Sequence, residues 1–277
     1  MSKVSIIGLG AIGGGVGQAL ARVGTFELSG YDPRPEAFAP LGGAMRTGVS
    51  PADASEGVDV AFVAVVNDAQ VRAVMTGEGG VLSAKTLPGM IVILSTISIP
   101  VVFWAAEEAA KRGVKLIDCG VCGTRGLQEN AMPTMVGGDV EAIAQARPVI
   151  EAFSSPMVHC GELGNGMRAK LACNMILFTD WAVAWQGAQL ATAAGVPLDR
   201  FVEAVNAAGK WVRPHMGLVE DGVGVSMPGM PTLSRPSTAA FADKDLRAAL
   251  ALAADLGVEL PSAEVALRIF PRVAGLA

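Results

Sequence analysis

A glycine pattern near the start of the chain has the spacing of a phosphate-binding turn. Gly8, Gly10 and Gly13 lie in KVSIIGLGAIGGGV, after a short apolar run and at the start of a helical pattern. Glycines at these positions allow a tight turn, a close approach of the backbone to a pyrophosphate, and close packing of helix on strand. The N-terminus of the helix adds free N–H donors and a positive dipole. The pattern therefore predicts a dinucleotide site that includes Ala11 and Ile12.

An acidic residue follows at the distance that such a site requires. Asp32 ends the second apolar run, roughly 20 residues after Gly13. A carboxylate there accepts hydrogen bonds from the adenine ribose and repels a ribose phosphate, which favours NAD over NADP. Arg34 leaves NADP open, because its guanidinium could bind a phosphate or merely lie against the adenine. The alternative is a glycine-rich turn that binds nothing.

A lysine within an apolar helical pattern is the second feature that could do chemistry. In GELGNGMRAKLACN, Lys170 and Asn174 stand four residues apart, so both side chains emerge on one face of a helix. A desolvated amine can exchange a proton with a substrate oxygen near neutral pH. Together with a dinucleotide site, this predicts hydride transfer. The alternative is a lysine whose amine reaches the solvent along the protein surface.

Two cysteines stand three residues apart in DCGVCGTRG, at positions 119 and 122. A metal site would need more ligands, and the remaining cysteines and histidines offer no second pair with suitable spacing. A redox pair would normally open a helix, which this one does not. We therefore predict no metal site, and four free thiols in a cytoplasmic protein.

The elements that must position these residues follow from the hydrophobic pattern. Up to about residue 160, short apolar runs alternate with helical patterns, and runs such as VDVAFVAVV suit strands covered on both faces. The sequence thus predicts a Rossmann-type doubly wound α/β sheet in a dinucleotide-binding domain, residues 1–162. An all-helical C-terminal domain for substrate binding and dimerisation is expected in residues 163–277. Its helix 167–194 is apolar on all sides, so we expect it to be buried all round and to join a subunit interface.

Composition excludes several classes of protein. The chain has 277 residues, of which 51% are hydrophobic and only 17% charged, which suits two domains and an oligomer. A net charge of −5 without basic runs argues against nucleic-acid binding. Glycines interrupt the apolar N-terminus, and no apolar run reaches about 18 residues, so neither a signal peptide nor a membrane span is expected. We predict a cytoplasmic homodimer or homotetramer with a small-molecule substrate.

Several segments, in order, resemble the β-hydroxyacid dehydrogenase family. This group includes 3-hydroxyisobutyrate dehydrogenases, tartronate semialdehyde reductases and short-chain semialdehyde reductases. GLGAIGGGV resembles its glycine signature, LSTIS (94–98) its serine-threonine segment, DCGVCGTRG its substrate loop and GNGMRAKLACN its catalytic signature. MVGGD follows the substrate loop as in the family, and ADKDLRAAL (242–250) resembles its C-terminal lysine-aspartate segment. The resemblance covers nearly the whole chain.

The resemblance implies a role for each matching residue. Lys170 would be the general acid/base, and Asn174 would help to hold the substrate. Thr96 would lie near the nicotinamide ribose, Lys244 would approach the cofactor, and Asp245 would support the cleft. With the glycine turn, the expected cofactor contacts are Gly8, Gly10, Ala11, Ile12, Gly13, Asp32, Arg34, Val66, Asn67, Thr96 and Lys244.

The substrate loop departs from the family pattern. Cys122 stands where the family usually has a serine, and Gly120 where it usually has a proline. A thiol is a weaker donor than a hydroxyl, so backbone N–H groups of residues 122–124 are expected to cradle an acidic group. Arg125 either grips a carboxylate with two hydrogen bonds or faces the solvent. The expected substrate contacts are Cys122, Gly123, Thr124, Arg125, Asn174 and Trp211.

The sequence thus predicts an NAD-dependent dehydrogenase or reductase, with NADP possible, that acts on a small hydroxyacid or its semialdehyde. Imine reduction on the same scaffold is one alternative, although such relatives usually lack the lysine. A dinucleotide-binding protein without turnover is an alternative of another class, which the altered loop leaves open. A thiol-based redox protein would instead depend on Cys119 and Cys122.

Overall fold

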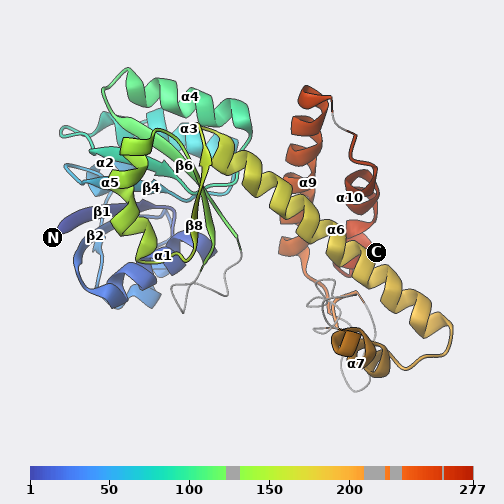
Figure 1. Ribbon diagram of the computed structural model, residues 1–277. Helices are drawn as coiled ribbons and strands as arrows, with labels where there is room; N and C mark the ends of the chain where they lie inside the picture. Colours follow the sequence, from blue (N-terminus) through green and yellow to red (C-terminus); the bar gives the residue numbers. More distant parts are fainter. Residues whose placement is uncertain (123–131, 209–221, 225–232, 258, 277) are drawn as a thin grey trace. The chain divides into compact units, whose positions relative to one another are not determined.

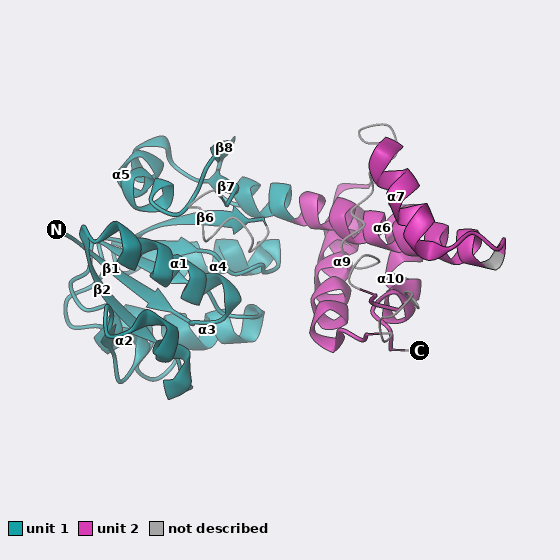
Figure 2. Cartoon of the chain, turned by 90° about the horizontal axis from the view of Figure 1, so that it is seen from below, with its two compact units in different colours: residues 1–170 teal, residues 171–277 magenta. Residues whose placement is uncertain are grey.

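The computed structural model describes residues 1–122, 132–208, 222–224, 233–257 and 259–276. The chain forms two compact units, Met1–Lys170 and Leu171–Ala277 (Figure 2). Helix α6 (Asn165–Ala193) begins in the first unit and continues through the second.

Unit 1 is built on one eight-stranded sheet of order β3-β2-β1-β4-β5-β6-β7-β8. All neighbouring strands are parallel except β6 and β7, which are antiparallel. An antiparallel pair needs no crossover helix between its strands. The strands are β1 (Ser2–Ile7), β2 (Phe26–Tyr31), β3 (Arg46–Thr47), β4 (Val60–Val63), β5 (Met90–Ile93), β6 (Lys115–Val121), β7 (Thr134–Gly137) and β8 (Met157–Gly161).

Helices cover both faces of the sheet (Figure 1). Because side chains alternate along a strand, Ile6 belongs to a core cluster with α1 and α5, whereas Ile7 belongs to a cluster with α3 and α4. This double cover explains why β4 and β5 are buried along their whole length. The helices are α1 (Ala11–Val23), η1 (Pro35–Leu41), α2 (Pro51–Ala54), α3 (Asp68–Thr76), η2 (Val81–Ser83), α4 (Ile99–Ala110) and α5 (Val140–Glu151).

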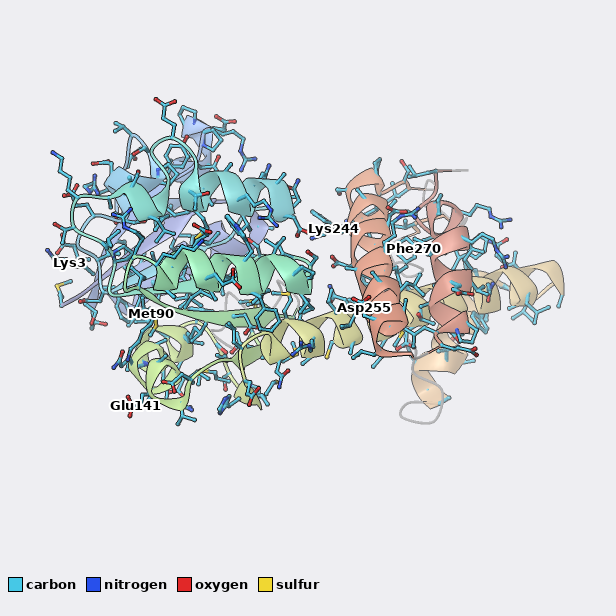
Figure 3. The ribbon with its side chains drawn as sticks, turned by 90° about the horizontal axis from the view of Figure 1, so that it is seen from above. Lys3, Met90, Glu141, Lys244, Asp255 and Phe270 are labelled. Carbon is cyan, nitrogen blue, oxygen red and sulfur yellow. The ribbon has the colours of Figure 1, made fainter. Side chains whose placement is uncertain are left out.

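Unit 2 is helical in its described residues. Besides its part of α6 it contains α7 (Leu198–Ala208), α9 (Pro236–Leu256) and α10 (Pro261–Val273). Phe178 of α6 meets Phe270 of α10 edge to face, with ring centroids 5.5 Å apart, and Figure 3 labels Phe270. The predicted fold class, a doubly wound sheet followed by a helical region, is confirmed.

Helix α6 was expected to be buried all round, in part at a subunit interface, and in the single chain one of its faces is exposed. Ile176, Val183 and Leu190 are 54%, 55% and 73% exposed. They recur at steps of seven residues and therefore share one face of the helix, while Phe178 and Ala182 of the same helix lie in the core of unit 2. None of the helices in the described part of the chain has the length and hydropathy that crossing a membrane would need.

Candidate active site

The predicted cofactor residues of unit 1 follow the carboxyl ends of neighbouring parallel strands. Gly8 comes directly after β1, Asp32 after β2, Asn67 shortly after β4 and Thr96 shortly after β5. Since these strands are adjacent in the order β2-β1-β4-β5, their carboxyl ends meet at one edge of the sheet. From β1 the chain adds β2 and β3 on one side, and from β4 onward it adds strands on the other side of β1. Open α/β sheets bind ligands at such a switch in strand order.

The glycine turn leaves an open space at the start of α1. Gly8 has φ +95°, and a Cβ on it would lie 2.6 Å from the Ala64 carbonyl oxygen. A Cβ on Gly13 would lie 1.9 Å from the Gly8 oxygen, but one on Gly10 would meet nothing within 4 Å. Gly8 and Gly13 therefore serve the chain's own packing, whereas the space beside Gly10 remains for another group. Ala11 is exposed and Ile12 half-buried in the first turn of α1.

The carboxylate of Asp32 is fixed beside this turn. Its Oδ2 accepts the N–H of Leu9 at 2.8 Å, and its Oδ1 accepts the N–H of Arg34 at 3.0 Å. The Arg34 guanidinium adds bonds of 2.9 and 3.1 Å to the two oxygens. Burial by itself would raise the pKa of Asp32, but these hydrogen bonds and the charge of Arg34 outweigh it and lower the pKa. Asp32 is therefore an ionised acceptor at the end of β2.

Asn67 and Val66 lie at the start of α3. The Asn67 side chain caps this helix by accepting the N–H of Gln70 at 2.9 Å, and Gln70 Oε1 accepts the N–H of Val66 at 2.9 Å. The Val66 side chain is 54% exposed. Asn67 thus acts as a helix cap.

Two residues that the sequence analysis did not assign tie this loop to the one after β5. Ser98 donates from Oγ to Asp68 Oδ2 at 2.6 Å, and its N–H donates to Asp68 Oδ1 at 3.0 Å. Ser95 Oγ accepts the N–H of Val65 at 2.8 Å. These bonds hold Thr96, which is half-buried, between two anchored serines. In the sequence, these bonds could have been suspected from Asp68, directly after Asn67, and from the serines of LSTIS.

Lys170 lies in the second turn of α6 and is 6% exposed. Its Nζ donates to the Sγ of Cys122, the residue after β6, at 3.7 Å. Gly120 permits this approach, because a Cβ there would lie 2.5 Å from the Lys170 Cβ. The N–H of Cys122 donates to the Pro133 carbonyl at 3.1 Å, so it is already engaged and drops out of the expected cradle for an acidic group.

Asp118, which the sequence analysis did not assign, is fully buried in β6. Its Oδ1 accepts the N–H of Gly164 at 2.7 Å, and its Oδ2 accepts the N–H of Met167 at 2.5 Å. Burial raises the pKa of this carboxyl, and the two N–H groups offset only part of that effect. The signal in the sequence was an acid inside the otherwise apolar strand LIDCGV.

In unit 2, Asn174 of α6 pairs with Asp245 of α9. The Asn174 Nδ2 donates to Asp245 Oδ2 at 2.6 Å, and the two residues are 6% and 5% exposed. Asp245 Oδ1 is buried and accepts no hydrogen bond from the described residues, although Lys244 Nζ lies 3.2 Å from it. Lys244, labelled in Figure 3, is about one third exposed.

Some predicted residues lie outside the described ranges, namely Gly123, Thr124, Arg125 and Trp211. The four cysteines are free thiols, of which Cys119 is buried and Cys173 exposed. Burial, with the nearby charge of Asp118, raises the pKa of Cys160 as well as that of Cys119. Within the described ranges, His, Cys, Asp and Glu side chains form no group of three or more that could hold a metal ion.

Comparison with known proteins covers nearly the whole chain. Residues 3–161 match the NAD binding domain of 6-phosphogluconate dehydrogenase, and residues 164–276 match the family described as NAD-binding of NADP-dependent 3-hydroxyisobutyrate dehydrogenase. An uncharacterized oxidoreductase of Mycobacterium tuberculosis is 34% identical, over 87% of this chain and 83% of its own length. An L-threonate dehydrogenase of Cupriavidus necator is 31% identical, over 76% of this chain and 72% of its own.

A solved structure matches the chain over nearly its whole length. The crystal structure of 3-hydroxyisobutyrate dehydrogenase from Salmonella typhimurium aligns with a TM-score of 0.81 at 28% identity, and the match covers 98% of this chain and 93% of that one. The two family matches fall on the sheet with its glycine turn and on the helical region with Asn174. The chain belongs to the β-hydroxyacid dehydrogenase family of NAD(P)-dependent oxidoreductases.

Proposed function

We propose that this protein transfers a hydride between the nicotinamide cofactor and a small hydroxyacid or its semialdehyde, with Lys170 as the general acid/base. The observation that carries the proposal is the burial of Lys170 on α6. This lysine is only 6% exposed, and its Nζ contacts Cys122, the residue after strand β6. The relatives named L-threonate dehydrogenase and 3-hydroxyisobutyrate dehydrogenase support the substrate class, because both names denote small hydroxyacids.

The residues at the sheet edge fit a dinucleotide. The open space beside Gly10 and the N-terminus of α1 suit a pyrophosphate. The Asp32 carboxylate would accept hydrogen bonds from the adenine ribose and would repel a phosphate on it, so we propose NAD as the preferred cofactor. When bound, the nicotinamide accepts or supplies the hydride. The further residues proposed to hold the cofactor are Gly8, Ala11, Ile12, Gly13, Arg34, Val66, Asn67, Thr96 and Lys244.

Lys170 handles the proton in both directions. In oxidation its neutral amine takes the proton of the substrate hydroxyl at Nζ, and in reduction its ammonium gives that proton to the aldehyde oxygen. The charge that Nζ meets on the oxygen develops only in the transition state, so the interaction lowers the barrier. Burial of the side chain excludes water and strengthens this interaction.

Asn174 is proposed to hold the substrate, with its amide oriented by Asp245. The 2.6 Å bond that Nδ2 donates to the Asp245 carboxylate fixes the orientation of the amide. For the substrate carboxylate we propose the Cys122 side chain together with Gly123, Thr124, Arg125 and Trp211. Since the N–H of Cys122 is engaged with Pro133, the remaining loop donors would carry most of this binding.

A substrate panel tests the proposal. Purified protein would be mixed with NAD or NADP and with two- to four-carbon hydroxyacids, or with the reduced cofactor and the matching semialdehydes, and nicotinamide absorbance would be followed. We expect turnover with at least one hydroxyacid pair and a preference for NAD that Asp32→Ala abolishes. Cyclic imines would be tested with the reduced cofactor as well, and turnover of these alone would favour the imine reductase alternative. NADH binding without any turnover would favour the non-catalytic alternative.

We also propose that the protein is a homodimer or homotetramer. Dinucleotide binding is assigned to residues 1–162, and substrate binding and dimerisation to residues 163–277. The exposed apolar side chains of Ile176, Val183 and Leu190 on α6 support an interface there. Light scattering on the intact chain and on Val183→Glu tests this, and a monomeric wild-type protein would contradict it.

A further inference from the structure

We infer that Asp118 is a positioning residue for Lys170, because its carboxylate ties the first turn of α6 to strand β6 and thereby sets the place of the lysine amine. The inference rests on the proposed function, in which Lys170 moves the proton. The Asp118 carboxylate accepts the backbone N–H groups of Gly164 and Met167 at the start of α6, so its effect on Lys170 would act through the helix.

The two oxygens of Asp118 bind two different parts of the helix start. Oδ1 accepts the N–H of Gly164, just before α6, and Oδ2 accepts the N–H of Met167 in its first turn. N–H groups at this end of a helix have no partner within the helix, and a carboxylate suits its positive dipole. Lys170 follows Met167 by three residues, so one helical turn joins the anchored N–H to the lysine.

Three glycines bring this helix start against the sheet. A Cβ on Gly166 would lie 2.5 Å from the Met135 oxygen and 2.9 Å from the Asp118 backbone oxygen. A Cβ on Gly137 would lie 2.5 Å from Asp118 Oδ1 and 2.6 Å from the Gly166 nitrogen. With the close contact at Gly120, α6 therefore begins in direct backbone contact with β6 and β7. Such packing fixes the distance between α6 and the sheet. The two hydrogen bonds of Asp118 fix the rotation of α6 about its axis and its position along that axis.

The Asp118 side chain matches the donors at this place. An apolar residue would leave the N–H groups of Gly164 and Met167 without this acceptor. The fully buried acid supplies two oxygens that reach these N–H groups, which are three residues apart. A carboxylate that accepts two hydrogen bonds fixes the direction in which its donors point, which apolar packing does not.

The test measures how fast the Lys170 amine reacts with a chemical label, so it does not depend on turnover. Asp118→Asn keeps the shape of the side chain but leaves only one acceptor oxygen. We would label wild type and variant with an amine-reactive anhydride under native conditions and follow the Lys170 peptide by mass spectrometry. The expected result is a several-fold faster labelling of Lys170 in Asp118→Asn, while surface lysines such as Lys111 are labelled at unchanged rates.

Asp139 provides a matched control. Its Oδ1 accepts the N–H groups of Glu141 and Ala142 at 3.0 Å each and caps α5, which carries no lysine of the site. Asp139 is exposed, and Asp139→Asn removes the negative charge of a helix cap but keeps its accepting oxygen, so Lys170 labelling and kcat should stay at wild-type values. If Asp118→Asn does not fold, Asp118→Ser, which removes charge and bulk together, replaces it.

A kinetic cycle separates positioning from general damage. Asp118→Asn should lower kcat on the order of 10- to 100-fold, as expected for a misplaced catalytic group, with little change in the KM for the cofactor. In a Lys170→Ala background the same substitution should cause no further loss. Unchanged Lys170 labelling in Asp118→Asn, or an equal loss of kcat in both backgrounds, would overturn the inference. If Lys170→Ala keeps full turnover while Asp118→Asn still speeds labelling, the proposed function fails and the positioning stands.

Discussion

The amine of Lys170 and the thiol of Cys122 are direct neighbours, with Nζ 3.7 Å from Sγ. They come from elements far apart in the sequence, and Gly120 makes room for the contact. An adjacent ammonium favours the thiolate form of a cysteine, which is the nucleophilic form. Burial, with the charge of Asp118, raises the pKa of the Cys119 and Cys160 thiols.

Cys122 should therefore react with iodoacetamide faster than Cys119 or Cys160 at neutral pH. We expect Lys170→Met to slow this reaction several-fold, because the positive charge is lost, and Lys170→Arg to preserve it. Peptide mass spectrometry in a Cys173→Ser background, which lacks the exposed thiol, measures the rates. Equal Cys122 rates in wild type and Lys170→Met would contradict the prediction.

Gly10 and Gly13 should respond to alanine in opposite ways. Gly13→Ala forces a Cβ against the Gly8 oxygen, and overpacking of this kind costs about 1–3 kcal/mol of unfolding free energy or more. The Cβ of Gly10→Ala would lie near no other atom within 4 Å. This variant should therefore lose at most about 1 kcal/mol of unfolding free energy, through its weaker helix cap. Gly10→Ala should nevertheless bind NADH much more weakly. Thermal unfolding and a fluorescence titration with NADH check both halves, and wild-type affinity in Gly10→Ala would refute the proposed pyrophosphate site.

Asp32 should make folding stability depend on pH in the acid range. Its pKa is lowered in the folded chain, so the ionised carboxylate stabilises the fold at pH values above the usual carboxyl range. That contribution should be lost as the pH falls below about 4 and through the lowered folded value. The difference in Tm between wild type and Asp32→Asn should accordingly shrink from pH 6 to pH 3. A difference that grows on acidification would have the wrong sign.

The buried pair of Asn174 and Asp245 should matter more for stability than an exposed pair on the same helix. Asp245→Ala removes the buried 2.6 Å bond that the Asn174 amide donates, and removing one partner of a buried hydrogen bond costs about 1–3 kcal/mol. Asp243→Ala removes an exposed 2.9 Å ion pair with Arg247 and should cost less than about 1 kcal/mol. Urea unfolding of both variants measures the difference, and equal losses would show that the buried bond contributes nothing special.

The sequence was sufficient for those features that depend on local pattern. The glycine turn, Asp32 and the strands of the sheet follow from spacing and periodicity, because a buried parallel strand and a helix start each have a recognisable local composition. The run VDVAFVAVV, expected to form a strand covered on both faces, contains β4, which is buried along its whole length. The two-residue strand β3 is too short to produce any periodic signal.

Features that depend on contacts between distant segments could not be predicted in this way. That Asp118 binds the start of α6 requires knowing that Gly137 and Gly166 let the helix touch the sheet. That the N–H of Cys122 is engaged depends on the antiparallel pairing of β6 with β7. The exposed face of α6 escaped prediction because hydrophobicity alone does not tell whether the same chain or a partner covers a helix.

The most direct test of the account is the oxidation of a reacting hydroxyacid by wild type, Lys170→Ala and the surface control Lys111→Ala, read as the rise of NADH absorbance. Lys111 is exposed and paired with Glu108, so its variant should behave as wild type. We expect Lys170→Ala to lose at least about 100-fold in kcat, the contribution of a general acid/base, and to retain its affinity for NADH. A Lys170→Ala protein that turns over at the wild-type rate would contradict the central claim.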